Sequence, residues 1–513
     1  MVVTPGRALA ACGAAGTADG PRVGLVLSGG GARGLAHIGV LEVIEREGLR
    51  VDCIAGTSMG AAVGALWASG YPAARIAEIV GSIDWQEVFS GHRLRPLIPL
   101  SRRLDDVPSA LRIGLEGWKL RLPPSRDSDY RLNWLLFKTL AAAGVGAGED
   151  LDRLPVPFRA IATDLATGAP VVLARGSLAR AVRASMSTPV TLPSVSLDGR
   201  TLVDGGLANN IPVSVAREMG ASVVIAVDAT SPPLRPEQYR DLYGVGVQIV
   251  DVLMRARNAE YAQPADLIVN PELGDHAFND YSGVERLIAA GRRAAGQDAP
   301  RWRALASGHA PRSSTAPSLR ADVVGVEVRG QRHVDESTVR ASFGVIPRQP
   351  FDMEGVLRGL DRVWATGLFA AVWVDARPVE GGLRLVLEVT EAPRLAAELG
   401  LSYDEADRAA GFVRLRNRNA FGHGERLDVQ LLGGEPGIAS PASSSRSGPS
   451  SIATATTPAA PSSRGTSRPP RFNSRSAPTC SRRRDWRWAA SIRSSGPGWT
   501  FPSEPTTTAC SPG

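Results

Sequence analysis

The stretch CIAGTSMG, residues 53–60, joins a short apolar run to a G-x-S-x-G motif, and the apolar residues after it predict a helix. A serine in a sharp turn between a strand and a helix needs small neighbours, because larger side chains would crowd the backbone. Gly56 and Gly60 are such neighbours, which makes Ser58 a candidate nucleophile. Five-residue matches of this kind are common by chance, so an ordinary glycine-rich turn is the alternative.

A second glycine-rich loop lies one structural unit earlier in the chain. Residues 23–27, VGLVL, predict an apolar strand, residues 28–34, SGGGARG, a loop, and residues 35–48 a helix. A further strand is predicted at residues 51–55, and this order of strand, loop, helix and strand predicts an α/β fold with a parallel sheet. Such sheets bind ligands at the carboxyl ends of their strands, where both glycine-containing loops lie. Further strands are predicted at residues 158–162, 200–203 and 222–227, and residues 82–147 are predicted to be helical and irregular.

The first loop also matches the dinucleotide-binding pattern G-x-G-x-x-G, through Gly29, Gly31 and Gly34. In that fold an acidic residue at the end of the second strand binds the ribose, whereas Asp52 stands near the start of the predicted strand. The other interpretation is an oxyanion hole, because consecutive glycines before a helix present backbone N–H groups at the positive end of the helix dipole. Ser58, on the neighbouring unit, would face those N–H groups.

A nucleophilic serine needs a base, and the sequence offers two candidates. Ser58, Asp204 and His276 follow the chain order of a Ser-Asp-His triad, but His276 sits in an unmarked polar loop, GDHAF. Asp204 follows an apolar strand and precedes Gly205 and Gly206, so it could take the serine proton directly or merely cap the turn. A free Asp titrates at about pH 3.9, so direct proton transfer requires a hydrogen bond to Ser58 and a partly dry site that raises the pKa.

Composition and charge argue against several classes of protein. The four cysteines are far apart in the sequence, so we predict no metal site and no disulfide framework, with Cys53 as a buried apolar residue. No apolar run reaches about 18 residues, so no transmembrane helix is predicted. The net charge is +7, but positions 437–513 hold ten of the 58 basic residues and only two of the 51 acidic ones. The rest of the chain is therefore close to neutral, which argues against a nucleic-acid partner.

Taken together, the segments 28–34, 56–60 and 204–206 resemble the patatin-like phospholipase family. The resemblance extends over residues 21–306 and includes the segments 162–168, 184–189 and 206–213. It implies a three-layer α/β hydrolase domain with a parallel sheet, and it implies neither a cofactor nor a metal.

The resemblance also implies roles for individual residues. Ser58 would be the nucleophile and Asp204 the base, in a Ser-Asp dyad without histidine. The implied oxyanion-hole and motif residues are Gly29, Gly30, Gly31 and Arg33, together with Gly34, Gly56, Gly60, Gly205 and Gly206. The implied activity is that of a serine esterase in lipid metabolism, which cleaves acyl esters of phospholipids or lysophospholipids through an acyl-enzyme at a membrane surface. Neither the residues nor the resemblance indicates an oligomeric state.

Two further modules follow a linker at residues 307–319. Residues 320–392 predict a small α+β domain in the order strand, helix, helix, strand, strand, which resembles a POTRA domain, a periplasmic module that precedes outer-membrane barrels. Residues 393–436 predict three strands with alternating apolar residues, and residues 417–427 are similar to the opening hairpin of surface-antigen barrels of the outer-membrane assembly class. A barrel needs at least about eight strands, so we interpret this part as an incomplete β-barrel fragment.

The two ends of the chain lack such patterns. Residues 1–20 are interpreted as a leader or signal remnant. Residues 9–12, LAAC, resemble a lipobox, but the apolar region expected before it is missing. We therefore expect either a truncated start or a flexible leader. Residues 437–513 predict a disordered tail, and we hypothesise that a frameshift replaced the rest of the barrel. The modules imply a bacterial outer-membrane location or secretion through that membrane. The alternative function is therefore an outer-membrane translocator or assembly protein that carries the hydrolase as passenger.

Overall fold

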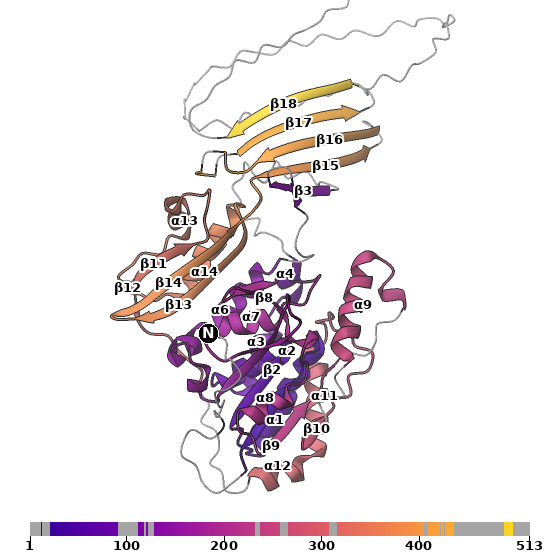
Figure 1. Cartoon of the computed structure of the whole chain (residues 1–513), viewed down its shortest axis with the longest axis vertical. Helices are drawn as coiled ribbons and strands as arrows, with labels where there is room; N and C mark the ends of the chain where they lie inside the picture. The colour runs from indigo at the N-terminus through magenta and orange to yellow at the C-terminus, as the bar shows by residue number, and fades with distance from the viewer. Residues whose placement is uncertain are drawn as a thin grey trace, which may run out of the picture. The chain divides into compact units, whose positions relative to one another are not determined.

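The computed structural model describes residue 12 and residues 21–90, 111–116, 119–121, 128–230, 236–256, 265–306, 315–404, 408–420, 422–424, 426–434 and 487–495. These residues belong to two compact units, whose elements are drawn in Figure 1. The first unit contains a largely parallel sheet with its helices and a small α+β domain, and the second contains an antiparallel sheet.

The central sheet of the first unit has the strand order β10-β9-β1-β2-β5-β8-β7, with β6 beside β5. Its strands are β1 (Val23–Leu27), β2 (Cys53–Thr57), β5 (Phe158–Asp164), β6 (Pro170–Leu173), β7 (Val195–Leu197), β8 (Arg200–Asp204), β9 (Val223–Val227) and β10 (Leu267–Val269). The predicted parallel sheet is confirmed for β10, β9, β1, β2 and β5. However, β8 runs antiparallel to both β5 and β7. Asp198 and Gly199, both with positive φ, form the two-residue turn between β7 and β8 that only antiparallel strands can share.

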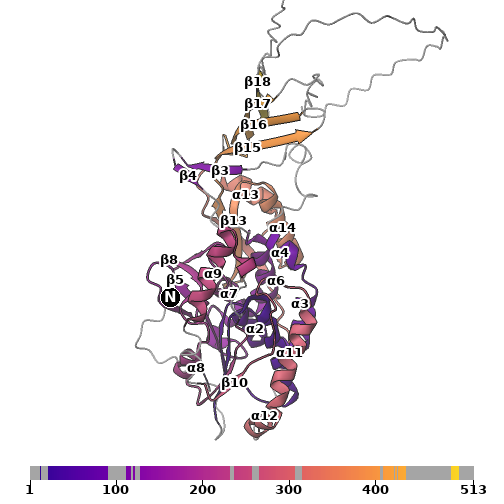
Figure 2. The same ribbon diagram turned by 90° about the vertical axis from the view of Figure 1, so that its right-hand side faces the viewer.

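Helices cover both faces of this sheet and give the three layers that were expected. They are α1 (Ala36–Arg46), α2 (Met59–Ala68), α3 (Ala73–Gly81), α4 (Trp85–Ser90), α6 (Tyr130–Ala147), α7 (Leu178–Ser185), α8 (Val213–Glu218), α9 (Leu242–Arg255), α11 (Val284–Gln297) and α12 (Ala299–Ala306). Leu25 and Leu27 of β1 belong to one core cluster with α1, α2 and α11, whereas Val26 belongs to a second cluster with α8. Figure 2 shows α8 and α11 on opposite sides. Because successive strand residues point to opposite faces, β1 is buried on both, as its apolar sequence predicts.

A disulfide bond ties the N-terminal segment to this sheet. Cys12 is joined to Cys53, is buried in the second core cluster, and donates its backbone N–H to the Met219 carbonyl at 2.9 Å. The prediction that Cys53 is buried is confirmed, but the prediction of no disulfide is wrong for this pair, because two cysteines 41 residues apart in sequence meet in the folded chain. Of the predicted leader, residues 1–20, only Cys12 lies within the described residues.

The α+β domain follows the predicted order of elements, with one short strand added. It comprises β11 (Asp322–Arg329), α13 (Glu336–Phe343), β12 (Gln349–Pro350), α14 (Met353–Ala365), β13 (Phe369–Val379) and β14 (Gly382–Glu391), in the sheet order β12-β11-β14-β13. Its core also includes Tyr130, Phe137 and Ala141 from α6 of the preceding domain. The ring of Tyr130 stacks on Trp364 at 4.7 Å, and its hydroxyl donates to Asp361 at 2.7 Å. Helix α6 therefore serves two hydrophobic cores.

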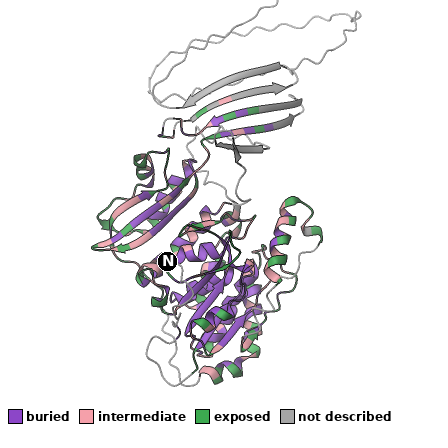
Figure 3. Cartoon of the chain, in the orientation of Figure 1, coloured by how far each residue is buried: buried purple, intermediate pink, exposed green. Residues whose placement is uncertain are grey.

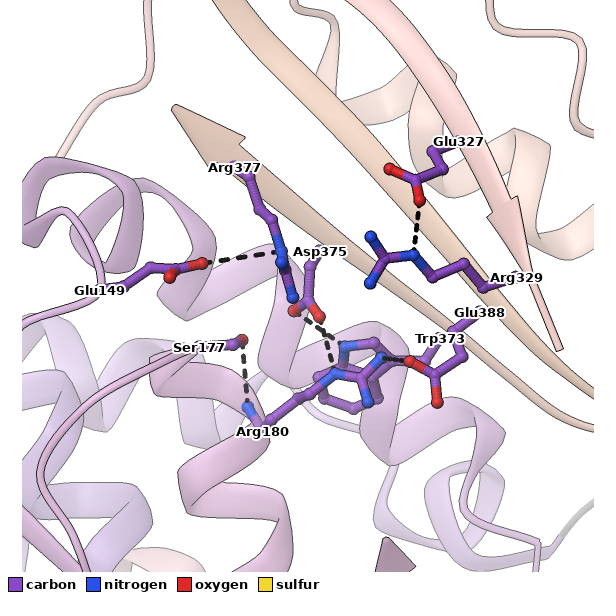
Figure 4. A network of polar contacts seen from close by, with 9 residues as sticks. All are labelled: Glu149, Ser177, Arg180, Glu327, Arg329, Trp373, Asp375, Arg377 and Glu388. Atoms are coloured by element: carbon purple, nitrogen blue, oxygen red, sulfur yellow. Dashed lines mark hydrogen bonds and ion pairs between the residues drawn. The ribbon is translucent and has the colours of Figure 1, made fainter. Parts of the chain in front are cut away.

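A polar network, shown in Figure 4, joins α7 to β13 and β14. Arg180 donates from Nε to Asp375 at 2.7 Å and from a terminal nitrogen to Glu388 at 2.7 Å. Its guanidinium lies 5.1 Å from the centre of the Trp373 ring, and the Trp373 indole N–H donates to Asp375 at 2.9 Å. Asp375 is buried, so the Arg180 cation compensates a carboxylate that has lost most of its water.

The second unit is a single antiparallel sheet in the order β18-β17-β16-β15-β3-β4. Its strands are β3 (Leu111–Glu116), β4 (Lys119–Arg121), β15 (Leu395–Asp404), β16 (Arg408–Asn417), β17 (Arg426–Gly434) and β18 (Arg487–Ser495). Strands β15 to β17 agree with the three predicted ones. In contrast, β3 lies in a segment predicted to be helical and irregular, and β18 in the predicted disordered tail, whose other residues lie outside the described ranges. Both strands carry apolar residues at every second position, a strand pattern that the predictions for these two segments overlooked: Leu111, Ile113 and Leu115 in β3, and Trp488, Ala490 and Ile492 in β18.

No helix in the described part of the chain is long and apolar enough to cross a bilayer.

We predict that Arg180→Ala lowers the free energy of unfolding of the first unit by about 3 kcal/mol, because it leaves the buried Asp375 carboxylate without its cation. Chemical denaturation of the purified chain measures this. Arg175→Ala is the matched control: Arg175 is half exposed and lies 3.9 Å from Asp150, so its loss should change stability by less than about 1 kcal/mol. Equal effects of the two variants would contradict the assigned role of Arg180.

Candidate active site

Ser58 occupies the turn between β2 and α2 in a conformation that few side chains adopt. Its φ is 52° and its ψ is −121°, and it is the N-cap residue of α2. A side chain on Gly56 would collide with the backbone of Gly60 and Ala61, and one on Gly60 with the Leu27 carbonyl at the end of β1. The G-x-S-x-G pattern is thus required by packing at both glycines, and the turn projects Ser58 beyond the carboxyl end of the sheet.

The register of the sheet brings Asp204 to Ser58. Thr57 on β2 pairs with Ile161 on β5, and the next residue of β5, Ala162, pairs with Asp204 at the end of β8. Ser58 and Asp204 therefore lie level with each other on either side of β5. The Ser58 hydroxyl donates to Asp204 Oδ2 at 2.8 Å, and the Ser58 backbone N–H donates to Ser185 Oγ at 2.8 Å.

The Asp204 carboxylate is buried and held by further donors. Oδ2 also accepts from the Thr188 hydroxyl at 2.8 Å, and Oδ1 accepts from the Gly206 backbone N–H at 2.9 Å. Burial raises the pKa of Asp204 above its ordinary value, and the hydrogen bonds from Gly206, Thr188 and Ser58 oppose that rise only in part. The carboxylate is therefore a stronger base than a solvated Asp.

His276, the other candidate base, lies in a loop with different partners. Its Nε2 is 2.6 Å from the Asp280 carbonyl oxygen, and its Nδ1 is 4.0 Å from the Asp280 carboxylate. The cavities that contain Ser58 are lined by other residues, His276 not among them. The structure thus brings together Ser58 and Asp204 and leaves His276 in its loop.

The glycine loop lies directly beside Ser58. A Cβ on Gly29 would stand 3.2 Å from the Cβ of Ser58. The Gly29 N–H donates weakly to the Asn210 carbonyl at 3.4 Å, whereas the N–H groups of Gly30 and Gly31 have no hydrogen-bond partner among the residues that the structure describes. These two N–H groups precede a short 3-10 turn (Gly31–Leu35) and α1, so they lie at the positive end of the helix dipole. They are the donors that an oxyanion could use.

Arg33 has a different position from the one that the resemblance implied. Its Nε donates to the Thr230 carbonyl at 3.2 Å, and one terminal nitrogen donates to the carbonyls of Gly274 and His276 at 2.8 and 3.1 Å. Arg33 is buried and lines neither cavity beside Ser58. The expectation that it stands beside the oxyanion hole is therefore corrected: the side chain fastens the glycine loop to two neighbouring loops. Sequence could not show this, because the acceptors are backbone carbonyls about 200 residues away.

Two cavities open onto Ser58. The larger, of about 450 Å³, has a mainly apolar wall formed by Phe89, Met186, Leu192, Phe278 and Tyr281. The smaller, of about 70 Å³, contains Asp204 and the glycine loop and is walled by α9 through Val247, Val250 and Met254. Apolar walls beside the polar pair Ser58 and Asp204 suit a ligand with a hydrocarbon chain and one polar group.

Sequence reasoning missed several residues of this site. Thr188 was included only as part of a matching segment, although its hydroxyl contacts Asp204. Tyr281 stacks on Trp85 at 4.3 Å and lines the larger cavity, but it comes from a polar loop without periodicity, so no sequence signal marked it. Within the described ranges, no group of three or more His, Cys, Asp and Glu residues could hold a metal ion.

Comparison with known proteins relates part of this chain to one family. The profile of the patatin-like phospholipase family matches residues 25–217. Patatin-like phospholipase domain-containing protein 6 of Mus musculus is 34% identical over 214 residues, which cover 41% of this chain and 14% of that protein. Lysophospholipase NTE1 of Pyricularia oryzae is 33% identical over 213 residues, 41% of this chain and 12% of that protein.

Two further similar proteins are matched over a larger share of their own length. An uncharacterised NTE family protein of Mycobacterium bovis is 32% identical over 207 residues, 40% of this chain and 49% of that protein. The crystal structure of VipD from Legionella pneumophila is 15% identical with a TM-score of 0.33, over 56% of this chain and 68% of that one. This chain therefore spans half or less of the length of these curated relatives. Its residues 25–217 form a patatin-like phospholipase domain.

Proposed function

We propose that this chain is a serine esterase that cleaves acyl esters of phospholipids or lysophospholipids. The observation that carries the proposal is the 2.8 Å hydrogen bond from Ser58, which lines a largely apolar cavity, to the buried carboxylate of Asp204. Gly30 and Gly31 of the glycine loop line the smaller cavity together with Ser58, and their backbone N–H groups have no hydrogen-bond partner within the described part of the chain. A nucleophile, a base and an oxyanion hole thus converge on one point.

In the acylation step, Asp204 takes the proton of the Ser58 hydroxyl as the oxygen attacks the ester carbonyl. The N–H groups of Gly30 and Gly31 stabilise the negative oxygen of the tetrahedral intermediate. Asp204 then returns the proton to the departing alcohol oxygen, which leaves an acyl-enzyme on Ser58. A water molecule repeats the sequence in the deacylation step, with Asp204 as its base, and releases the fatty acid.

The substrate class follows from the walls of the cavity. Aromatic, methionine and leucine side chains suit an acyl chain, whereas Gln86 and Asn279 supply polar groups in the same cavity for the head group. A volume of about 450 Å³ accommodates a ligand of lipid type. One relative is named lysophospholipase, which supports the same substrate class.

The second unit favours an additional function at a membrane. The apolar residues of its strands lie on one face and are partly exposed: Leu395, Leu399, Val413, Leu415 and Leu427. The other face is buried and charged, with Glu398 at 3.5 Å from Arg414 and 3.2 Å from Arg416. In the strands of a transmembrane barrel, apolar residues face the lipid and polar or charged residues face the interior, and this sheet has the same two-sided arrangement. We therefore also propose that this sheet belongs to an outer-membrane barrel that carries or exports the hydrolase, with the α+β domain as its POTRA-like neighbour.

The dyad predicts which substitutions abolish activity. Ser58→Ala and Asp204→Asn should each lower kcat/KM for a short-chain ester by at least about 10³-fold, because each removes one half of the proton-transfer pair. His276→Ala should retain most of the activity. If folded His276→Ala is inactive and Asp204→Asn is active, the base is assigned wrongly.

The pH dependence tests the environment of Asp204. Activity requires the carboxylate form, so the rate should rise as the pH increases through the pKa of Asp204, which burial places above its ordinary value. Thr188→Val removes a hydrogen bond that stabilises the carboxylate and should shift this limb of the pH–kcat/KM profile to higher pH. An unchanged or lower midpoint would show that Thr188 does not act on the ionisation of Asp204.

The membrane proposal predicts where the chain accumulates. Expressed in a bacterium with an outer membrane, the full chain should fractionate with that membrane and migrate faster in gels when unheated. Leu399→Asp combined with Leu415→Asp should abolish both properties, because charges on a lipid-facing surface are costly. Ile346→Asp, at an aliphatic position on the α+β domain that is more exposed than these two leucines, should abolish neither. A wild-type chain recovered only in the aqueous fraction would overturn this proposal.

A further inference from the structure

Helix α9, Leu242–Arg255, is apolar around its whole circumference. Its sequence, LYGVGVQIVDVLMR, contains two charged residues, and these neutralise each other: Arg255 donates to Asp251 at 2.6 Å. A helix that is apolar on all sides is normally covered on all sides, either by protein or by lipid. Among the residues that the structure describes, protein covers only one side of α9.

The inward side of α9 closes the catalytic cavity. Val247, Val250 and Met254 line the cavity that contains Ser58 and Asp204. A Cβ on Gly206, two residues after Asp204, would lie 3.1 Å from the Met254 sulfur. Helix α9 therefore forms the wall between the dyad and the surroundings.

The outward face of α9 consists of aliphatic side chains that water reaches. The exposed fractions are 90% for Leu242, 41% for Val245, 56% for Ile249, 49% for Val252 and 55% for Leu253. Figure 3 shows these exposed positions as green segments along α9, whereas the strands of the central sheet are purple. A contiguous aliphatic surface of this kind marks an interaction site.

A strained loop extends this apolar face toward the mouth of the larger cavity. Val190 has a φ of 72°, which is unfavourable for a β-branched residue, and its side chain lies against Gly246 of α9 while remaining 38% exposed. The next residue, Thr191, has its hydroxyl 3.3 Å from that of Tyr243, and both line the larger cavity. Apolar surface and cavity are thus continuous.

We propose that the outward face of α9, together with Val190, docks onto a lipid surface, so that an acyl ester passes from that surface into the cavity beside Ser58. The proposal rests on the proposed lipid esterase function. Lipid is the fitting occupant because the face is aliphatic and uncharged and leads directly to a cavity for an apolar chain. With 14 residues, α9 is too short to span a bilayer, so it lies in the plane of the interface. Since the face is uncharged, docking does not require anionic lipids.

The first test needs no catalysis and uses the full chain. Hydrogen exchange of residues 242–255 should slow at least tenfold when phosphatidylcholine vesicles are added, at constant protein concentration. A control without vesicles distinguishes lipid from a second copy of the chain. If raising the protein concentration alone protects residues 242–255, the face is a self-association surface and the proposal is overturned. An absence of protection with vesicles would overturn it as well.

The second test combines Ile249→Gln with Leu253→Gln, since Gln keeps the helix propensity of the replaced residues. Hydrolysis of phosphatidylcholine vesicles should fall at least tenfold, while hydrolysis of a water-soluble butyrate ester should stay within about twofold of the wild-type rate. The matched control is Ile346→Gln, at a position 62% exposed on the α+β domain, which should change neither rate. Equal vesicle rates for wild type and the α9 variant would overturn the proposal. If the wild-type chain cleaves no ester, the proposed esterase function is refuted, and the hydrogen-exchange experiment alone tests whether α9 docks onto lipid.

Discussion

The hydrogen bond between Ser58 and Asp204 depends on constraints that the rest of the first unit supplies. The serine must stand in a left-handed turn, which only the glycines at positions 56 and 60 make room for. The carboxylate must be level with it, which the pairing of β5 with an antiparallel β8 provides. An error of one residue in that register would turn Asp204 to the opposite face of the sheet. The geometry of the dyad is therefore a property of the sheet as a whole.

The polar groups around Asp204 are those that a buried carboxylate requires if it is to act as the proposed base. An ionised Asp204 without donors would be strongly destabilised in a dry site, whereas too many donors would lower its pKa until it could not accept a proton. The structure lies between these limits, because Thr188, Gly206 and Ser58 donate to the carboxylate while burial still dominates its pKa. A histidine would meet the same requirement with its unperturbed pKa, which is why a dyad without histidine needs closer control of burial.

Sequence indicated the features of this site that depend on local chemistry. The turn at Ser58 and the glycine loop could be predicted because their backbone conformations admit only small residues. Arg33 was misplaced and Tyr281 was missed, because their positions depend on how the loop at residues 274–283 packs against distant segments. The position of strand β8 was predicted correctly. Its antiparallel direction follows from the Asp198-Gly199 turn, which is a hairpin signal and not part of the hydrophobic pattern.

Helix α7, only eight residues long, connects the dyad to the α+β domain. Arg180 on its outer side pairs with Asp375 of that domain. One turn later, the buried Arg183 binds Asp129 at 2.9 Å and Ser187 at 2.6 Å, which fixes the end of the helix. Ser185 then accepts from the Ser58 N–H, and the following loop delivers Thr188 to Asp204. A displacement of α7 would change both the orientation of Ser58 and the donors to Asp204, so the α+β domain contributes to the geometry of this pair without contacting it.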